Sequence, residues 1–292
     1  MTKYVVQKDA MPHYRQLTSA CGLTAALMAI QPNIDFHAQT LLDKVAKKCQ
    51  SIYENMGELL KTPNARHQVA AAYMILKAAK SEEVCKFLSA FDTAEYEFIH
   101  EVILFELRKR LTGKAKFTTR SLEKLVEAYQ KKGSIDRGFL YEYVMRVKSD
   151  KELKLLMALF GYKFVHFIYS VDGTGAINFE HIDQILGSGL IKDDSLNTYD
   201  EIFEFMLAFL EVNFAKSMIL LNTGDHWVTL QKLIIEDEKR QPEIYFLDPS
   251  TTETPLKLFD LKTSAWYYVF QPDENLRAGI TPVIEKLLDV RV

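Results

Sequence analysis

The stretch Gln16-Leu-Thr-Ser-Ala-Cys21-Gly-Leu-Thr-Ala-Ala-Leu-Met28 decides how the rest of the chain is interpreted. The segment before Cys21 is mostly polar, whereas small and apolar residues dominate after it, so we expect a helix to begin at Cys21. A cysteine in the first turn of a helix lies beside free backbone N–H groups and the positive end of the helix dipole, and both favour the thiolate. The stretch therefore predicts an activated cysteine on an N-terminal helix.

The residues that follow, from about 37 to 159, are dense in Ala, Leu, Glu and Lys. Apolar residues return there every three or four positions, which is typical of amphipathic helices. One expected buried face contains Leu41 and Val45, and another contains Val69 and Leu76. A further helix is expected over residues 122–129. This part of the chain is predicted to be a helical block.

Past Gly161 the pattern becomes mixed, and alternating aromatic and β-branched residues indicate strands. Turn-rich stretches at 222–225 and 236–242 separate the later strands, which favours an antiparallel sheet. The expected strands cover residues 162–169, 216–222, 226–233, 243–247 and 265–270, with helices over 179–186 and 199–214. The fold class is predicted to be α+β.

The sheet region supplies what an activated cysteine needs. His226 begins a predicted strand in Gly-Asp-His-Trp, and Asp248 ends the next one in Phe-Leu-Asp-Pro. If these strands are antiparallel neighbours, the two side chains lie close together, so that His226 can act as base and Asp248 can orient it. Gln16, five residues before Cys21, can add its side-chain amide to the Cys21 backbone N–H in an oxyanion hole.

The order Gln16, Cys21, His226, Asp248 resembles that of papain-like cysteine peptidases. Three motifs look most like the branch of bacteriocin-processing double-glycine peptidases. They are the Cys-Gly before a small-residue helix, the His-Trp at the start of a strand and the Asp-Pro after a strand. The Gln-x4-Cys-Gly-Leu stretch is also similar to the actin maturation protease of eukaryotes. The resemblance covers about 60 residues in three islands. It departs from many members of the family, which have Gly-Pro where this chain has Gly22-Leu23.

The resemblance implies a papain-like core in which the cysteine-bearing helix packs on an antiparallel sheet. Residues 1–36 would form its N-terminal part, 37–160 a large inserted helical subdomain, and 161–292 the β-rich part with the histidine and the aspartate. By family transfer, Cys21 is the nucleophile, His226 the base, Asp248 the orienting acid and Gln16 the oxyanion donor. Gly22 and Trp227 are expected to contact substrate, although Trp227 also suits a core aromatic on a strand.

Composition restricts the remaining function classes. Lys and Arg number 36 against 39 Asp and Glu, a net charge of −3 that argues against nucleic acid or an anionic membrane as partner. Three widely spaced cysteines suit a reducing compartment, and the charged first nine residues do not resemble a secretory signal, so we expect a cytoplasmic protein. No metal or other cofactor is expected, because no zinc spacing occurs and the EF-hand-like stretch 170–181 has too few carboxylates for calcium.

The sequence thus predicts a cysteine peptidase acting on a peptide or protein, with processing of an N-terminus or of one specific site among the expected reactions. Two alternatives remain open. A ubiquitin-like-protein hydrolase or other isopeptidase shares the same residue order, and the helical block would then grip a folded partner. A non-catalytic helical interaction module with a vestigial triad would have a Cys21 no more reactive than Cys49 or Cys85.

Overall fold

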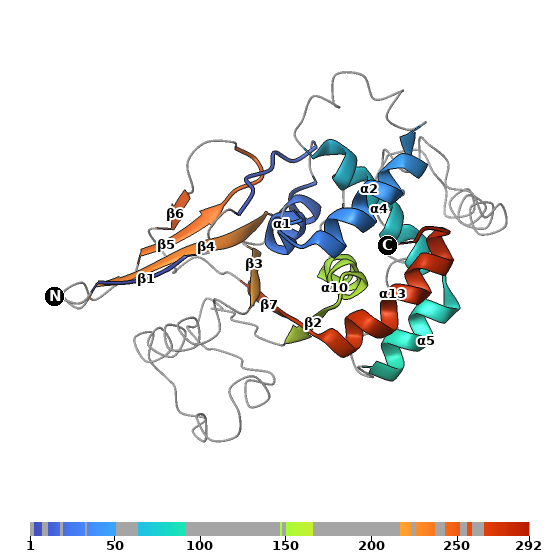
Figure 1. Ribbon diagram of the computed structural model, residues 1–292. Helices are drawn as coiled ribbons and strands as arrows, with labels where there is room; N and C mark the ends of the chain where they lie inside the picture. The colour runs from blue at the N-terminus through green and yellow to red at the C-terminus, as the bar shows by residue number, and fades with distance from the viewer. Residues whose placement is uncertain are drawn as a thin grey trace, which may run out of the picture.

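The computed structural model describes the parts of the chain that carry its regular core. These are residues 3–7, 11–17, 20–32, 34–50, 64–91, 147, 150–165, 217–222, 226–236, 243–251, 256–258 and 266–291. Within them the protein is an α+β structure in which the helices cluster beside a long antiparallel sheet (Figure 1).

The sheet has seven strands, and every described pairing in it is antiparallel. The strand order is β2-β7-β3-β4-β5-β6, and β1 joins the long strand β4 beside its C-terminal half. The strands are β1 (Lys3–Gln7), β2 (Tyr162–Val165), β3 (Met218–Asn222), β4 (Trp227–Glu236), β5 (Glu243–Leu247), β6 (Leu256–Leu258) and β7 (Trp266–Pro272). Because β4 is flanked on both sides, it organises the whole sheet.

Helix α1 lies between the sheet and the other helices: it contacts β3 and β4, and it packs on α4 and α10. The helices are α1 (Cys21–Ile30), α2 (Phe36–Lys48), α4 (Ala65–Ala79), α5 (Glu82–Phe91), α10 (Asp150–Leu159) and α13 (Glu274–Leu288). Every residue of α1 is buried, as its run of small and apolar side chains requires. The Thr229 hydroxyl donates a 2.7 Å hydrogen bond to the Ala25 carbonyl and so attaches β4 to this helix.

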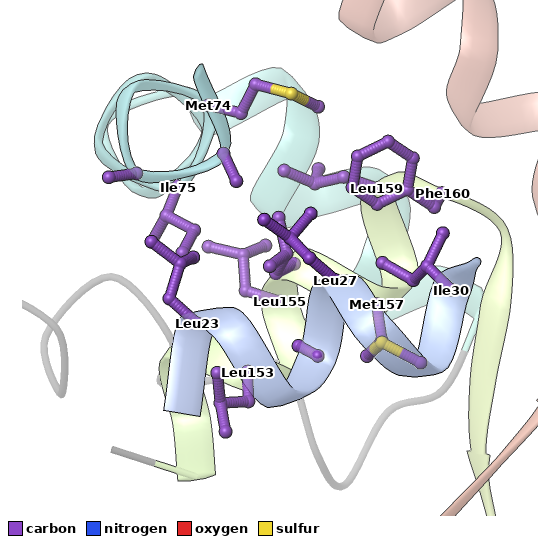
Figure 2. Close-up of a cluster of buried hydrophobic side chains, with 14 of the residues drawn as sticks. Leu23, Leu27, Ile30, Met74, Ile75, Leu153, Leu155, Met157, Leu159 and Phe160 are labelled. Carbon is purple, nitrogen blue, oxygen red and sulfur yellow. The ribbon is translucent and has the colours of Figure 1, made fainter. Parts of the chain in front are cut away.

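The core lies where α1, α4 and α10 meet, as Figure 2 shows. Leu23 and Leu27 of α1 point toward Ile75 of α4 and Leu155 of α10. Burial of such side chains is the main favourable term in folding, at about 1.5–3 kcal/mol for each one taken fully out of water. The helices described between residues 37 and 160 therefore share one core with the helix that begins at Cys21.

Most local expectations from the sequence are confirmed where the structure describes the residues. The helix expected to begin at Cys21 begins there, and the strands expected at 216–222, 226–233, 243–247 and 265–270 correspond to β3, β4, β5 and β7. The strand expected over 162–169 is described only as far as Val165. The helices expected over 122–129, 179–186 and 199–214 lie outside the described residues.

Three elements were not anticipated: the strands β1 and β6 and the C-terminal helix α13. Helix α13 is capped by the Asp273 carboxylate, which accepts from the Leu276 N–H at 2.9 Å, and it packs on α4, α5 and α10. In the described part of the chain, no helix is both long and apolar enough to cross a membrane.

Candidate active site

Cys21 is the first residue of α1 and is 4% exposed. The turn before it is held by a hydrogen bond from the Ala20 N–H to the Leu17 carbonyl at 3.1 Å. The N-cap residue, Ala20, supplies no side-chain cap. The first N–H groups of a helix have no partner within the helix, and that of Gly22 forms a hydrogen bond with the Cys21 sulfur. The thiol thus lies at the positive end of a buried helix.

His226 and Asp248 meet at one end of the sheet. Thr229 of β4 pairs with Leu247 of β5. His226, just before β4, and Asp248, just after β5, therefore lie at the same end of these two strands. The His226 Nε2 atom lies 2.7 Å from Asp248 Oδ1. Since α1 packs on β4, the histidine also reaches Cys21, whose sulfur forms a hydrogen bond with the imidazole. With Nε2 directed at Asp248, the nitrogen left for the sulfur is Nδ1.

The Asp248 carboxylate is held in place by its own turn. Oδ1 accepts a second hydrogen bond, from the Ser250 N–H at 2.7 Å. The Asp248 carbonyl lies 2.8 Å from Nε2 of His13, a residue of the segment that leads to Cys21. Asp248 is 8% exposed, and a buried carboxylate requires such partners to remain charged. The acid therefore has one defined orientation toward His226.

These contacts shift the pKa values of the three groups in complementary directions. The hydrogen bonds with Asp248 and Cys21 raise the pKa of His226 to about 10, although burial opposes them. Burial raises the pKa of Asp248, but hydrogen bonds from His226 and Ser250 outweigh it and lower that pKa to about 2. The aspartate is thus anionic and the histidine cationic at neutral pH.

Cys21 differs from the other two cysteines in its electrostatics. Burial raises the pKa of its thiol, but hydrogen bonds from the His226 side chain and the Trp227 backbone, with smaller effects of the His226 charge and the Gly22 backbone, lower it overall. Burial raises the pKa of Cys49 to about 12, and burial followed by the charge of Glu82 raises that of Cys85. Only Cys21 has a pKa shifted toward the nucleophilic thiolate.

Gln16 lies beside the turn that carries Asp248. Its backbone N–H donates to the Pro249 carbonyl at 2.8 Å. Its side-chain Oε1 is buried and has no hydrogen-bond partner among the described residues. The residue is therefore held through its backbone, and its side-chain Oε1 forms no hydrogen bond within the described part of the chain.

Gly22 and Trp227 approach the thiol through their backbones. Both supply backbone hydrogen bonds to Cys21. The Trp227 side chain is 1% exposed and packs against Tyr268 with 4.9 Å between ring centroids, as a core aromatic does. The contact of Trp227 with the site is thus made by its main chain.

The sequence analysis did not anticipate Gln68, nor the contacts of His13 and Ser250 with Asp248. Gln68 of α4 is completely buried, and its side-chain amide hydrogen bonds to Arg15 and Leu17, the two neighbours of Gln16. The available signal was a glutamine at a position where the spacing of Ala65, Val69, Ala72 and Leu76 marks an apolar face.

No three or more His, Cys, Asp or Glu side chains are grouped for metal binding in the described ranges. Compared with protein-family models, with curated proteins and with solved structures, the chain matches none.

Proposed function

We propose that the chain is a cysteine peptidase that hydrolyses peptide bonds through Cys21, His226 and Asp248. The single observation that carries this proposal is the hydrogen-bonded series from the thiol through the imidazole to the carboxylate, in which the thiol pKa is lowered and the imidazole pKa is raised to about 10. A thiolate paired with an imidazolium is the reactive state of a nucleophilic cysteine.

The fold we propose for the catalytic unit is the papain-like core. It is supported by a buried helix that begins with the cysteine and packs on an antiparallel sheet, and by adjacent strands β4 and β5 that carry the histidine and the aspartate at one edge. The resemblance in residue order supports the same conclusion.

In the proposed reaction the Cys21 thiolate attacks the carbonyl carbon of the scissile peptide, forming a C–S bond and a tetrahedral oxyanion. The Cys21 backbone N–H and the Gln16 side-chain amide donate hydrogen bonds to that oxygen. The His226 imidazolium then protonates the nitrogen as the C–N bond breaks, and the amine leaves.

The second half of the reaction releases the acyl group. The now neutral His226 takes a proton from water, which attacks the thioester carbonyl, and the thiolate leaves as the acid product forms. Asp248 holds the imidazole in orientation throughout and stabilises its charged form. The thiol is buried whereas the His226 side chain is 30% exposed, so substrate approaches from the side of the histidine.

The test is cleavage of a mixed library of peptides, with products identified by mass spectrometry. The chain should cleave a subset of them, Cys21→Ala should cleave none, and a chain with both Cys49→Ala and Cys85→Ala should retain activity. Cleavage that persists in folded Cys21→Ala would contradict the proposal. A ubiquitin C-terminal electrophile run beside the peptides tests the isopeptidase alternative, which predicts labelling of Cys21 without peptide cleavage.

The interaction-module alternative is less well supported, because a vestigial triad has no reason to keep its electrostatics. It predicts three cysteines of similar reactivity, whereas here the pKa of Cys21 is lowered and those of Cys49 and Cys85 are raised.

A further inference from the structure

Gln68 lies far from the triad in sequence, on helix α4 of the helical block, yet it contacts the segment that carries Gln16. Its Nε2 donates to the Arg15 carbonyl at 2.9 Å, and its Oε1 accepts from the Leu17 N–H at 2.8 Å. The Thr24 hydroxyl of α1 lies 3.1 Å from the same oxygen. One side chain therefore joins α4, the nucleophile helix and both neighbours of Gln16.

A further backbone contact of this segment comes from the turn after Asp248. The Gln16 N–H donates to the Pro249 carbonyl, so three consecutive residues are tied, alternately, to α4 and to the turn after Asp248. A backbone fixed at three successive residues has little freedom to rotate. The contacts with Gln68 and Pro249 thus fix the backbone of Gln16, and with it the point where the Gln16 side chain begins.

We infer that Gln68 is a positioning residue that holds Gln16 where its amide can meet the oxyanion, an inference that rests on the proposed function. An oxyanion donor is effective because it is fixed before the reaction begins, and removing one such donor costs about 10²–10³ in rate. A displacement of about 1 Å can cost about 10². Loss of the Gln68 contacts should therefore slow the steps that develop an oxyanion and leave the thiolate itself unchanged.

The alternative is that Gln68 is only a satisfied buried amide whose loss loosens the whole core. The two roles are separated by comparing two reactions of Cys21. With iodoacetamide the sulfur forms a bond to carbon as iodide leaves, and no oxyanion develops. With p-nitrophenyl acetate the sulfur adds to a carbonyl, a tetrahedral oxyanion forms, and p-nitrophenolate leaves as the acetyl thioester forms.

The experiment measures both rates at Cys21 in a Cys49→Ala, Cys85→Ala background, for the unchanged chain and for Gln68→Met. Methionine has a similar length, cannot donate to the Arg15 carbonyl, and offers the Leu17 N–H and the Thr24 hydroxyl only a weak acceptor. Gln39→Met on α2, where the glutamine is exposed, is the matched control. We expect Gln68→Met to lower the acetylation rate at least about tenfold. The rate of alkylation by iodoacetamide should stay within about twofold of that of the unchanged chain, because the thiolate is not affected. Gln39→Met should change neither rate.

A double-mutant comparison with Gln16→Ala completes the test. If Gln68 acts through Gln16, the Gln16→Ala, Gln68→Met chain acetylates no more slowly than Gln16→Ala alone. Additive losses, an equal fall in both reactions, or an unchanged acetylation rate would each overturn the assignment. Failure of the proposed function is a different result, since Cys21 of the unchanged chain would then react with iodoacetamide like an ordinary thiol.

Gln68→Glu keeps the inference testable if Gln68→Met does not fold. The carboxylate retains the acceptor for the Leu17 N–H but cannot donate to the Arg15 carbonyl. The ratio of acetylation to alkylation at pH 8 should fall below that of the unchanged chain while iodoacetamide reactivity persists. A ratio equal to that of the unchanged chain would refute the role assigned to Gln68.

Discussion

Removing the imidazole of His226 should make the reactivity of Cys21 depend on pH like that of an ordinary thiol. In the intact protein the His226 hydrogen bond and charge oppose the burial of the sulfur and lower its pKa. In His226→Ala only the backbone hydrogen bonds of Trp227 and Gly22 oppose that burial, so the pKa should return to the region of the ordinary value of 9.0. At pH 6 such a thiol is ionised in about one molecule per thousand.

The expected difference at pH 6 follows from the direction in which the pKa of Cys21 is shifted. While a thiol is mostly protonated, each pH unit by which its pKa is lowered raises its ionised fraction about tenfold. A thiolate of lower pKa is a weaker nucleophile, with a Brønsted slope of about 0.4–0.5, which reduces the gain in rate to roughly threefold for each such unit. At pH 10 the thiol of His226→Ala is mostly ionised too, and it should react faster than that of the unchanged chain because its thiolate is the stronger nucleophile.

The assay is alkylation by iodoacetamide from pH 5 to 10, with each cysteine followed separately by mass spectrometry. Cys85, whose pKa is raised, serves as an internal reference in every sample. The two rate profiles of Cys21 should cross between pH 6 and 10. The reasoning would be refuted if Cys21 of the unchanged protein titrated together with Cys85, or if the two profiles stayed parallel.

Three further outcomes are expected. Asp248→Asn should slow alkylation of Cys21 at pH 6, because the contact that most raises the pKa of His226 loses its charge; an unchanged rate would exclude the proposed role of the acid. The unfolding free energy that the same variant loses, measured with urea, should be largest between about pH 4 and 6.5 and should shrink as pH rises toward 10. The raised pKa of His226 contributes its full stabilisation below the unfolded value of 6.5, and this contribution is lost as pH passes about 10. The lowered pKa of Asp248 stabilises the fold above the unfolded value of 3.8, and this contribution is lost as pH falls toward about 2. Gly161→Ala should lower the unfolding free energy by about 2–4 kcal/mol, because Gly161 has a φ of +80° and a Cβ there would lie 2.5 Å from that of Arg277; urea unfolding within about 0.5 kcal/mol of the unchanged chain would contradict it.

The parts of the site that the sequence could predict are those with local signals. The break between polar and apolar residues at Cys21 is a helix start, and it predicts where the thiol lies. The strands that end near His226 and Asp248 are short alternating runs separated by turn residues, which predict an antiparallel neighbour relation. The second signal predicts that His226 and Asp248 lie close together, whereas the expectation that Cys21 joins them depended on the resemblance in residue order.

Elements that depend on distant partners could not be predicted in the same way. The strand β1 has only five residues and pairs with the far half of β4, more than 220 positions away, so nothing in its own sequence requires a strand. The helix α13 did have a signal, which the exposed Pro282 inside it obscured. That signal is the regular spacing of its buried residues, Leu276, Ile280, Ile284 and Leu288.

The helical block has a closer relation to the site than an appended unit would have. Helix α4 contributes Ile75 to the core around α1 and Gln68 to the segment around Gln16. Helix α1 has little surface of its own that could remain in water, since all of its residues are buried and many of its neighbours come from α4 and α10. Removing these helices would therefore expose the face that holds Leu23 and Leu27 and release the backbone on both sides of Gln16. The residues of the proposed triad come from the two ends of the chain, whereas helices α4 and α10 from its middle pack on α1, and α4 also holds the backbone around Gln16.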